Sequence, residues 1–366
     1  MSSLFTPFDL RTLTLANRIT VSPMCQYSAI DGAATDWHMT HLGTLALSGA
    51  GFLCLEATAV EADGRITPAD LGLWNDATES ALKPVLAAIR KYSKTVVAIQ
   101  LAHAGRKASC RVPWEGGELQ PVEAGGWVPW APSSVPFKPT DAAPRSLDAE
   151  GLKRVRTAFA DSARRAARLG IDAIELHAAH GYLLHEFLSP LANQRTDEYG
   201  GSLANRMRFP LEVFDAVRAA FPAERPVGVR VSATDWVGGG WDITETVTLA
   251  EELKRRGVDW VTASSGGASP LQRIPAGPGF QVPFAHAIRA GAGVNTVAVG
   301  LITDPRQAEA IVATGQADLV ALARGLLYDP RWGWHAAAEL GAKVAAPPQY
   351  WRAPPNEHKN LFLQPH

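Results

Sequence analysis

The chain has 366 residues, of which 46% are hydrophobic and 19% are charged, and its formal net charge is −1. A chain of this length and composition can bury a substantial core, in one large domain or in two smaller ones. The near-neutral charge provides no global field that attracts nucleic acid or an anionic membrane, and no apolar run reaches the ~20 residues that span a bilayer. We therefore expect neither nucleic acid nor membrane among its partners.

The cysteines and the N-terminus both point to the cytoplasm. Cys25, Cys54 and Cys110 are odd in number and widely spaced, which is typical of reduced thiols and not of a disulfide frame or a zinc cluster. The first residues, MSSLFTPFDLRTL, lack the basic and then apolar pattern of a secretory signal. Together these features predict a cytoplasmic protein.

Short apolar runs alternate with amphipathic stretches along the chain. We predict strands at residues 18–22, 52–57, 96–101, 171–177, 227–231, 260–263, 296–299 and 319–322. Helical periodicity marks residues 82–92, 152–169, 243–256 and 305–314. Strands that are apolar at consecutive positions indicate a parallel sheet buried on both faces. Eight β/α units predict an α/β fold of the TIM (β/α)8 barrel type, whereas the alternative, a doubly wound sheet, lacks a GxGxxG motif after its first strand.

Two segments break this rhythm. Residues 105–145, after the third strand, are rich in proline and tryptophan with little periodicity, as expected of a lid over a site or of a surface elaboration. Residues 347–366 are polar and rich in proline, which predicts an extended C-terminal arm. The expected organisation is one barrel domain over residues 1–346, including the excursion, followed by this arm.

The fourth predicted strand carries the most informative segment, IELHAAHGYLLHEFLSPLANQRTDEYGGSLANRMR, at residues 174–208. An apolar run delivers His177 and His180, and Tyr182 follows before what is expected to be a long loop. Imidazole and phenol groups together can hold an anionic oxygen and deliver a proton. The same histidines could bind a metal with Glu175 as a further ligand, or could be structural. The residues alone leave these alternatives open.

Polar or special residues also follow the other strands. In a barrel the carboxyl ends of the strands meet around one site. At these strand ends, Gly300 and Arg324 indicate a phosphate site. Gln100 and Arg230 could form hydrogen bonds with a ring that has donor and acceptor edges. Cys25 and Tyr27 could equally be packing residues. Combined with the histidine pair, the set indicates a flavin mononucleotide with a small substrate stacked on it.

Four segments resemble motifs of the Old Yellow Enzyme family: LFTPFDLRTLTLANRITVSPMCQYS, EATAVEADGRITPADLGLW, IQLAHAGRKAS and HAAHGYLLHEFLSPLANQRTDEYGGSLANRMRF. More narrowly, the chain is similar to the thermophilic-like class of FMN-dependent ene-reductases and xenobiotic reductases. The resemblance covers nearly the whole chain, and the fourth-strand motif is the most specific part of it.

The resemblance implies an FMN site and a substrate site. For FMN it implies isoalloxazine contacts from Pro23, Met24, Cys25 and Ala57, ring contacts from Gln100 and Arg230, and phosphate contacts from Gly300, Ala323 and Arg324. Ala323 stands where the family usually has glycine. For the substrate it implies hydrogen bonds from His177 and His180, a proton from Tyr182, and contacts from Tyr27, Cys25 and a neighbouring subunit's Arg352 in a homodimer or homotetramer.

The implied activity is reduction of the C=C bond of α,β-unsaturated carbonyl or nitro compounds, with NADPH or NADH as the hydride donor. Nitro compounds and quinones are further expected acceptors. Two other functions remain as alternatives at this point. One is a metal-dependent barrel hydrolase or lyase that uses His177 and His180, and the other is a flavin-binding protein without catalytic activity.

Overall fold

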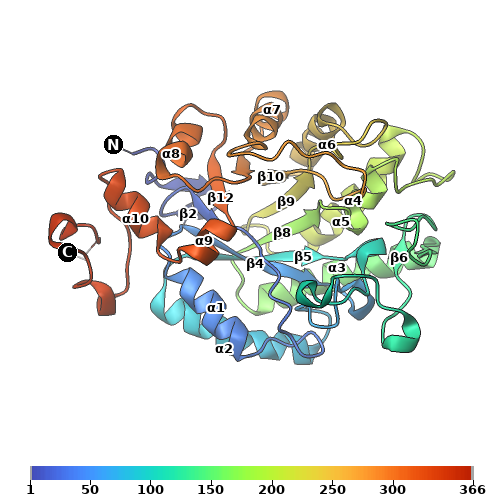
Figure 1. The fold of residues 1–366 in the computed structure, drawn as a ribbon, viewed down its shortest axis with the longest axis horizontal. Helices are drawn as coiled ribbons and strands as arrows, with labels where there is room; N and C mark the ends of the chain where they lie inside the picture. The colour runs from blue at the N-terminus through green and yellow to red at the C-terminus, as the bar shows by residue number, and fades with distance from the viewer. Residues whose placement is uncertain (1, 364–366) are drawn as a thin grey trace.

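A computed structural model describes residues 2–363 as a closed barrel of parallel strands surrounded by helices (Figure 1). The barrel strands, in chain order, are β3 (Ile19–Val21), β4 (Phe52–Ala59), β5 (Val96–Ala102), β8 (Ala173–Ala178), β9 (Val227–Ser232), β10 (Trp260–Ser264), β11 (Thr296–Val299) and β12 (Leu319–Leu322). The last strand, β12, pairs with the first, β3, and closes the ring. The TIM-barrel prediction is confirmed, and closure excludes the doubly wound open sheet.

The barrel strands form because their side chains are apolar on both faces of the sheet. All residues of β8 and β9 are buried, although the two strands carry Glu175, His177 and Arg230. One face of each strand points into the barrel and the other packs against the helices, so neither face meets water. The eight predicted strands match the observed ones within a few residues at each end.

The principal helices are α1 (Asp36–Ala46), α2 (Asp76–Tyr92), α3 (Ala149–Arg168), α5 (Leu203–Ala220), α6 (Ile243–Arg255), α7 (Val282–Ala292), α8 (Pro305–Ala313) and α10 (Trp332–Glu339). The four predicted helices correspond to α2, α3, α6 and α8. Helix α2 starts earlier than predicted because the Asn75 side chain accepts a hydrogen bond from the Thr78 backbone and caps a polar first turn. Among residues 2–363, no helix combines the length and apolarity needed to cross a membrane.

Two short helices, α4 (Leu183–Leu188) and α9 (Arg324–Tyr328), follow directly after strands β8 and β12. The prediction of a long loop that begins after Tyr182 is therefore wrong for its first six residues. Residues 183–188 form a helix whose residues are all buried. The polar side chains of this helix bond inside the protein: the Gly181 N–H donates to His185 Nδ1, and the Arg106 N–H donates to Glu186 Oε1.

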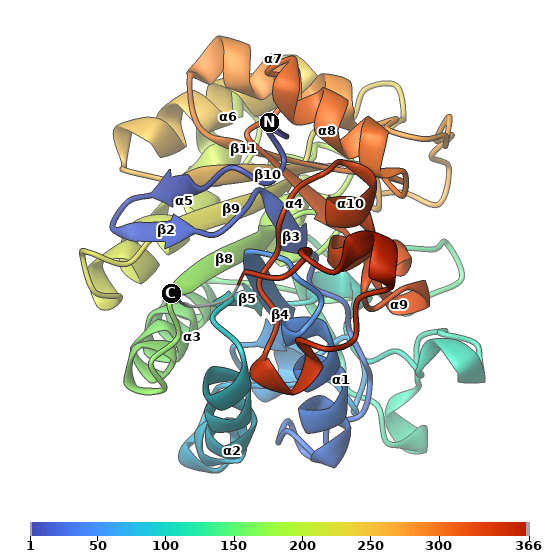
Figure 2. The same cartoon turned by 90° about the vertical axis from the view of Figure 1, so that its left-hand side faces the viewer.

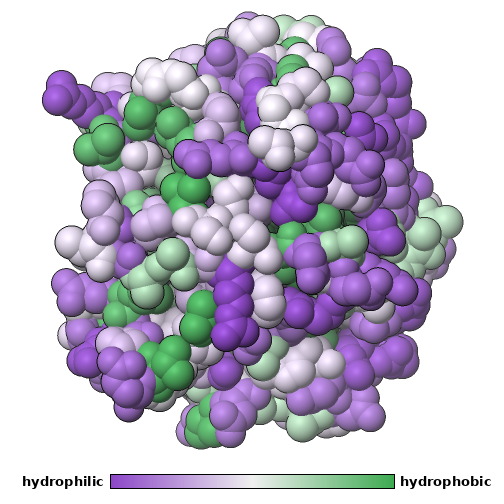
Figure 3. Space-filling view, turned by 90° about the vertical axis from the view of Figure 1, so that its right-hand side faces the viewer, coloured by the Kyte–Doolittle hydropathy of each residue, from purple (hydrophilic) through white to green (hydrophobic). Residues whose placement is uncertain are grey.

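The two ends of the barrel are closed differently. A hairpin of β1 (Phe8–Leu10) and β2 (Leu13–Leu15) covers the amino-terminal end, where Leu10 and Leu15 pack with Phe52 and Trp260. Figure 2 shows this hairpin and both termini on the same side of the molecule. The excursion and α4 lie on the opposite side, beyond the carboxyl ends of the strands (Figure 1). Seen from that side, hydrophobic patches lie between hydrophilic ones (Figure 3).

The excursion is not without structure. It contains three single-turn helices, η2 (Gly105–Lys107), η3 (Pro113–Glu115) and η4 (Val122–Ala124), and a small parallel pair, β6 (Trp130–Ala131) with β7 (Arg145–Ser146). The tail contains two further single-turn helices, η5 (Pro348–Tyr350) and η6 (Asn356–His358). It then folds back on the segment after α10, where the Leu363 N–H donates to the Val344 carbonyl. Phe362 packs edge-on against Trp334 of α10 at 4.8 Å. The end of the tail therefore packs against the rest of the same chain at this point.

Candidate active site

The predicted group on β8 is assembled as a compact cluster. The ring centroid of His177 lies 5.0 Å from that of His180 and 4.9 Å from that of Tyr182, and both contacts are edge-on. His177 is the last-but-one residue of β8, and Tyr182 is the residue that precedes α4. The turn between strand and helix thus brings two imidazoles and a phenol to one point at the carboxyl end of the barrel.

Both histidines are neutral at pH 7. Burial lowers the pKa of His177 and of His180 well below the usual value, and the nearby Arg230 charge lowers both further. The Ala179 backbone N–H donates to Nδ1 of His177 at 3.2 Å, so the single proton of the His177 ring lies on Nε2. That proton points towards His180, whose Nδ1 lies 3.3 Å from His177 Nε2.

Ser264 at the end of β10 influences which nitrogen of His180 carries a proton. His180 Nε2 lies 2.6 Å from the Ser264 hydroxyl, which itself donates to Gln281 Oε1 at 3.5 Å, so the Ser264 oxygen accepts the Nε2 proton of His180. His180 Nδ1 then accepts the Nε2 proton of His177 in the resting protein. A bound ligand oxygen can replace this acceptor for His177, and it receives a second hydrogen bond when the His180 proton shifts to Nδ1.

The backbone at His180 is strained and firmly held. Its φ of 60° lies in the left-handed region, which residues other than glycine seldom adopt. The His180 N–H donates to Ser232 Oγ at 2.9 Å, and Lys107 Nζ donates to the His180 carbonyl at 2.8 Å. Because bonds from two other segments fix this conformation, the imidazole is positioned before any ligand arrives.

A buried contact between His185 and Asp235 stabilises the same turn. His185 of α4 accepts a hydrogen bond from the Gly181 backbone through Nδ1 at 2.8 Å, and its Nε2 lies 2.9 Å from Asp235 Oδ1. Burial raises the pKa of Asp235, but its contact with His185 and the hydrogen bonds from Ser189 and Trp241 outweigh this effect and leave the pKa below its usual value. This pair connects the turn that carries Tyr182 to the loop after β9.

Tyr182 is a poor acid in the resting protein. Burial raises the pKa of its phenol well above 10, and the negative charges of neighbouring groups raise it further. Lys107 Nζ lies 5.1 Å from the ring centroid. No hydrogen bond joins the Tyr182 hydroxyl to another residue of the range 2–363. The phenol therefore keeps its proton at neutral pH and is free to donate it.

Arg230 lies beside His177, with which it pairs in the β8–β9 register. Its side chain is buried, and its Nε and Nη1 atoms have no hydrogen-bond partner within the part of the chain that the structure describes. A buried guanidinium normally uses all its donors. Two unused donors of a cation at the mouth of the barrel indicate a missing acceptor, such as a ligand with ring nitrogen or carbonyl groups.

Gln100 and Glu175 lie deeper in the barrel. Gln100 Nε2 donates to Glu175 Oε1 at 2.8 Å, and the Thr262 hydroxyl donates to Glu175 Oε2 at 2.6 Å. Glu175 is thus bound within the barrel and does not join the histidines. Within residues 2–363, no group of three or more His, Cys, Asp or Glu is placed to hold a metal ion. Within these residues, His177 and His180 therefore have no third side chain that could complete a metal site.

A bulge in β4 places Ala57 at the mouth. The β4–β5 register shifts between Leu55 and Ala57, so that Ala57 pairs with Gln100. The residues after β3, Pro23, Met24 and Cys25, are half-buried. Burial raises the pKa of the Cys25 thiol well above its usual value, as do the charges of Asp70 and Glu56. Cys25 is therefore a neutral thiol at physiological pH.

The ends of β11 and β12 form the third part of the predicted site. Gly300 follows β11 with a φ of 127°, and a side chain there would come within 2.8 Å of Gln281 Nε2. Ala323, after β12, has a φ of −114°, which a methyl group tolerates. Arg324 is exposed, and no ion pair or hydrogen bond within residues 2–363 engages its side chain. The alanine at position 323 therefore does not need the left-handed conformation that favours glycine.

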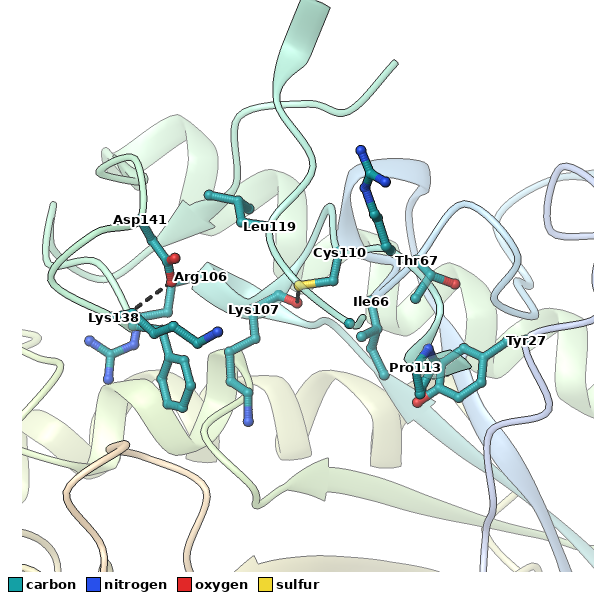
Figure 4. A pocket seen from close by; sticks show the side chains of 13 residues that line it. Tyr27, Ile66, Thr67, Arg106, Lys107, Cys110, Pro113, Leu119, Lys138 and Asp141 are labelled. Atoms are coloured by element: carbon teal, nitrogen blue, oxygen red, sulfur yellow. Dashed lines mark hydrogen bonds between the residues drawn. The ribbon is translucent and has the colours of Figure 1, made fainter. Parts of the chain in front are cut away.

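A cavity of about 170 Å³ lies between the excursion and the loop after β3, and Lys107, which binds the His180 carbonyl, is one of its lining residues (Figure 4). Tyr27, Lys107 and Cys110 contribute to its walls. Tyr27 has a φ of 50° and packs edge-on against Trp114 of the excursion. The excursion therefore forms one wall of a cavity at the barrel mouth.

Sequence reasoning missed several residues of this region, chiefly Lys107, Asp70, Ser232 and Ser264. Lys107 and Asp70 lie within the motifs IQLAHAGRKAS and GRITPADLGLW, but no charge pattern distinguishes them from surface residues. The two serines stand at the last positions of β9 and β10, so the strand-end rule that identified the other residues would have found them. Arg352 lies in the exposed part of the tail, and the single chain does not bring it to the mouth.

Comparison with known proteins identifies relatives over almost the full length. The model of the NADH:flavin oxidoreductase / NADH oxidase family matches residues 3–342. The NADPH dehydrogenase of Geobacillus thermodenitrificans is 45% identical over 351 residues, which cover 95% of this chain and 98% of that protein. The NADPH dehydrogenase of Bacillus licheniformis is 46% identical over 353 residues, which cover 96% and 98% of the two chains.

A solved structure agrees with these sequence relatives. Morphinone reductase in complex with tetrahydroNAD superposes with a TM-score of 0.77 at 28% identity, covering 100% of this chain and 98% of that one. This chain therefore combines the barrel fold and the cluster at its strand ends with relatives that are named NADPH dehydrogenase and morphinone reductase.

Proposed function

The chain belongs to the NADH:flavin oxidoreductase / NADH oxidase family and is an FMN-dependent NAD(P)H oxidoreductase of the Old Yellow Enzyme type, and we propose that it reduces the C=C bond of activated alkenes. The observation that carries the proposal is the pair of neutral imidazoles, 3.3 Å apart, with a buried phenol beside them. This arrangement can hold a carbonyl or nitro oxygen and protonate a carbon next to it. The alternative of a metal-dependent hydrolase or lyase is wrong, because the chain belongs to a flavin oxidoreductase family and the described residues place no third ligand beside His177 and His180.

The strand-end residues fit FMN. The unpartnered Nε and Nη1 of Arg230 are donors of the kind that the pyrimidine edge of a flavin accepts. Gly300, whose backbone is not covered by a side chain of its own, and the exposed guanidinium of Arg324 suit a phosphate group. Pro23, Met24, Cys25 and Ala57 supply an apolar wall, and Gln100 a further amide beside Arg230. Held by these residues, FMN would supply the two-electron redox chemistry that links NAD(P)H to the second substrate.

The side chains of this protein perform the remaining tasks. His177 and His180 hold the carbonyl or nitro oxygen of the substrate and stabilise the negative charge that develops on it. Tyr182 donates its phenolic proton to the α-carbon, so that a C–H bond forms as its O–H bond breaks. Cys25 and Tyr27 line the space for the substrate. Nitro compounds and quinones present similar oxygens and are proposed as further acceptors.

We propose that the protein acts as a homodimer or homotetramer. Arg352 is exposed in the tail, in a segment between two single-turn helices that does not reach the site of its own subunit. A neighbouring copy could receive this arginine at the rim of its substrate site. The same organisation makes residues 1–346 the barrel unit and residues 347–366 the arm, and the last residues of the arm lie outside the described range.

Two half-reactions test the proposed function. Under anaerobic conditions, NADPH or NADH is expected to bleach the yellow protein, and subsequent mixing with 2-cyclohexenone, a nitroalkene or a quinone is expected to restore the flavin absorbance. The saturated product should be identified by gas chromatography. Bleaching that no alkene reverses would contradict alkene reduction while leaving the flavin oxidoreductase activity intact.

Replacing Arg230 with methionine is expected to weaken FMN binding by about 10- to 150-fold. The basis is the loss of hydrogen bonds from a charged donor, each worth about 1.5–3 kcal/mol. Fluorescence titration of the apoprotein with FMN measures the change, since binding quenches the flavin. Arg289→Met, which removes an exposed pair with Asp318, serves as the matched control. Equal FMN affinity in the two variants would remove Arg230 from the cofactor site.

A further inference from the structure

A very small cavity beside Tyr182 contains a carboxyl group that the proposed reaction does not use. Its volume is about 10 Å³, close to the space that one water molecule requires. Asp70 and Tyr182 are the residues of its lining that carry an ionisable side chain, and the rest of the lining is glycine, alanine and isoleucine. A water molecule here would have the carboxyl and the phenol as polar partners.

Asp70 is fixed in one orientation by its own loop. The Thr67 hydroxyl and backbone N–H donate to Oδ1 at 2.7 and 3.1 Å, and the Ile66 N–H donates to Oδ2 at 2.7 Å. A carboxyl group offers about four positions for hydrogen bonds, so one remains available. Because Asp70 is only 2% exposed, that position faces the interior of the protein and not bulk solvent.

The acidities of the two groups are ordered for proton transfer towards the phenol. Burial raises the pKa of Asp70 to about 7, so a large fraction of the carboxyl is protonated at neutral pH. The phenol of Tyr182 has a pKa well above 10, again because of burial. A phenolate formed at Tyr182 would therefore take a proton from Asp70 with a gain in free energy.

Other titratable groups face Asp70 from each neighbouring segment. They are Glu56 on β4, Arg65 in the preceding turn, Cys25 and Tyr27 after β3, Cys110 after η2, and Tyr182 before α4. Of these, the negative charge of Glu56 adds to the effect of burial on the pKa of Asp70. The thiols and phenols stay neutral near pH 7. Burial lowers the pKa of Lys107 to about 8 and raises that of Glu186 to about 8, so the Asp70→Asn variant is needed to assign a titration near pH 7 to Asp70.

We propose that Asp70 is the acid that returns a proton to Tyr182 through one water molecule in the cavity they share. This inference rests on the proposed role of Tyr182. As the Tyr182 O–H bond breaks and a C–H bond forms on the substrate, a proton of the water passes to the phenol oxygen. The Asp70 proton passes to the water, and the aspartate is left as a carboxylate. Asp70 is a positioning and proton-supplying residue that does not contact the substrate.

The route back to solvent runs through the larger cavity. Ile66 lines both cavities, and Thr67, which binds the Asp70 carboxyl, lines the larger one. Lys107 is a less suitable proton source, because its ammonium group is engaged by the carbonyls of His180 and Gly267 at 2.8 and 3.2 Å. The carboxyl is thus the acid with a free position towards Tyr182.

The decisive test is the pH profile of the alkene half-reaction, measured by stopped flow with reduced holoenzyme and 2-cyclohexenone. In the unmodified protein the rate is expected to fall roughly 10-fold or more as pH rises through about 7, because the acid form of Asp70 is lost. Asp70→Asn should give a pH-independent rate at the level of the slow, high-pH plateau. A pH-independent rate at the fast plateau would mean that only charge matters and would overturn the relay, as would an unchanged profile.

Asp70→Asn could disturb its loop, so a second variant leaves the carboxyl in place. Ala59→Val adds two methyl groups to the cavity wall and is expected to exclude the water and give the same slow plateau. A normal profile in a folded, FMN-loaded Ala59→Val protein would overturn the proposal. Asp215→Asn is the matched control, because this carboxylate pairs with Arg256 on the outside of the barrel and lines neither cavity. Reduction by NADPH should be unchanged in all three variants.

The Tyr182→Phe background separates this inference from the proposed function. If Tyr182 is the proton donor, Asp70→Asn should cause no further loss in that background. An additional loss would place Asp70 on another route and overturn the relay, although the role of Tyr182 would stand. If Tyr182→Phe alone leaves the alkene rate unchanged, the proposed proton donor is wrong and the relay is overturned with it.

Discussion

Replacing His177 with alanine is expected to slow the alkene half-reaction about 100- to 1,000-fold. Loss of one donor to a developing oxyanion raises the barrier by about 2.7–4 kcal/mol in comparable sites. His177 carries its proton on Nε2 because the Ala179 backbone occupies Nδ1, so the donor is present throughout the neutral pH range. Stopped-flow reoxidation with 2-cyclohexenone measures the effect, and the double replacement with His180 should lose more.

Phenol binding provides an independent readout of the same role. A phenol whose oxygen lies between the two imidazoles is expected to stack on the oxidised flavin and give a long-wavelength charge-transfer band, which should weaken strongly in His177→Ala. His335→Ala, which removes an exposed histidine that pairs with Asp329, is the control. A full charge-transfer band together with a normal reoxidation rate in His177→Ala would show that the imidazole does not hold the substrate oxygen.

Replacing Tyr182 with phenylalanine is expected to slow alkene reduction by about 100- to 10,000-fold, the usual range for the loss of a positioned acid. The ring and its edge-on contact with His177 remain, so the change is confined to the hydroxyl. Reduction by NADPH should stay near normal, since that step forms no C–H bond on the substrate. Residual turnover is expected to come from protons supplied by solvent.

The comparison of acceptors makes this prediction specific. Quinones are reduced at oxygen, and their reoxidation of the enzyme should depend much less on Tyr182 than the reaction of an enone. Tyr199→Phe, which removes a hydroxyl near Glu212 on the outer helix α5, is the matched control. Equal losses with quinone and enone would indicate damage to the site as a whole and would contradict a proton-donor role.

Much of the site was predictable because barrel geometry converts sequence order into position. Residues that end consecutive strands must meet at the mouth, and for His177, Arg230 and Ala57 the register shows this directly. The helical period could not reveal α4, because its six residues are all buried and give no amphipathic pattern. The buried partners of its polar residues, such as Asp235 for His185, come from segments distant in the chain, here the loop after β9.

The protonation states were beyond the reach of the sequence. A histidine, a tyrosine or an aspartate in a motif has its ordinary acidity until its surroundings are known. Burial makes His177 and His180 neutral, raises the pKa of Tyr182 and brings that of Asp70 to about 7. The Ala179 and Ser264 contacts that govern the ring protons depend on a turn and on another strand.

By itself, the sequence determined the barrel, the order of its strands and the chemical types at their ends. It did so because hydrophobic periodicity and strand-end position are local properties that survive in a linear chain. Only the tertiary structure decided which donors are free, which carboxyls are protonated and where a water-sized space adjoins Tyr182. Those properties depend on desolvation and on contacts between segments far apart in the chain, which no local pattern encodes.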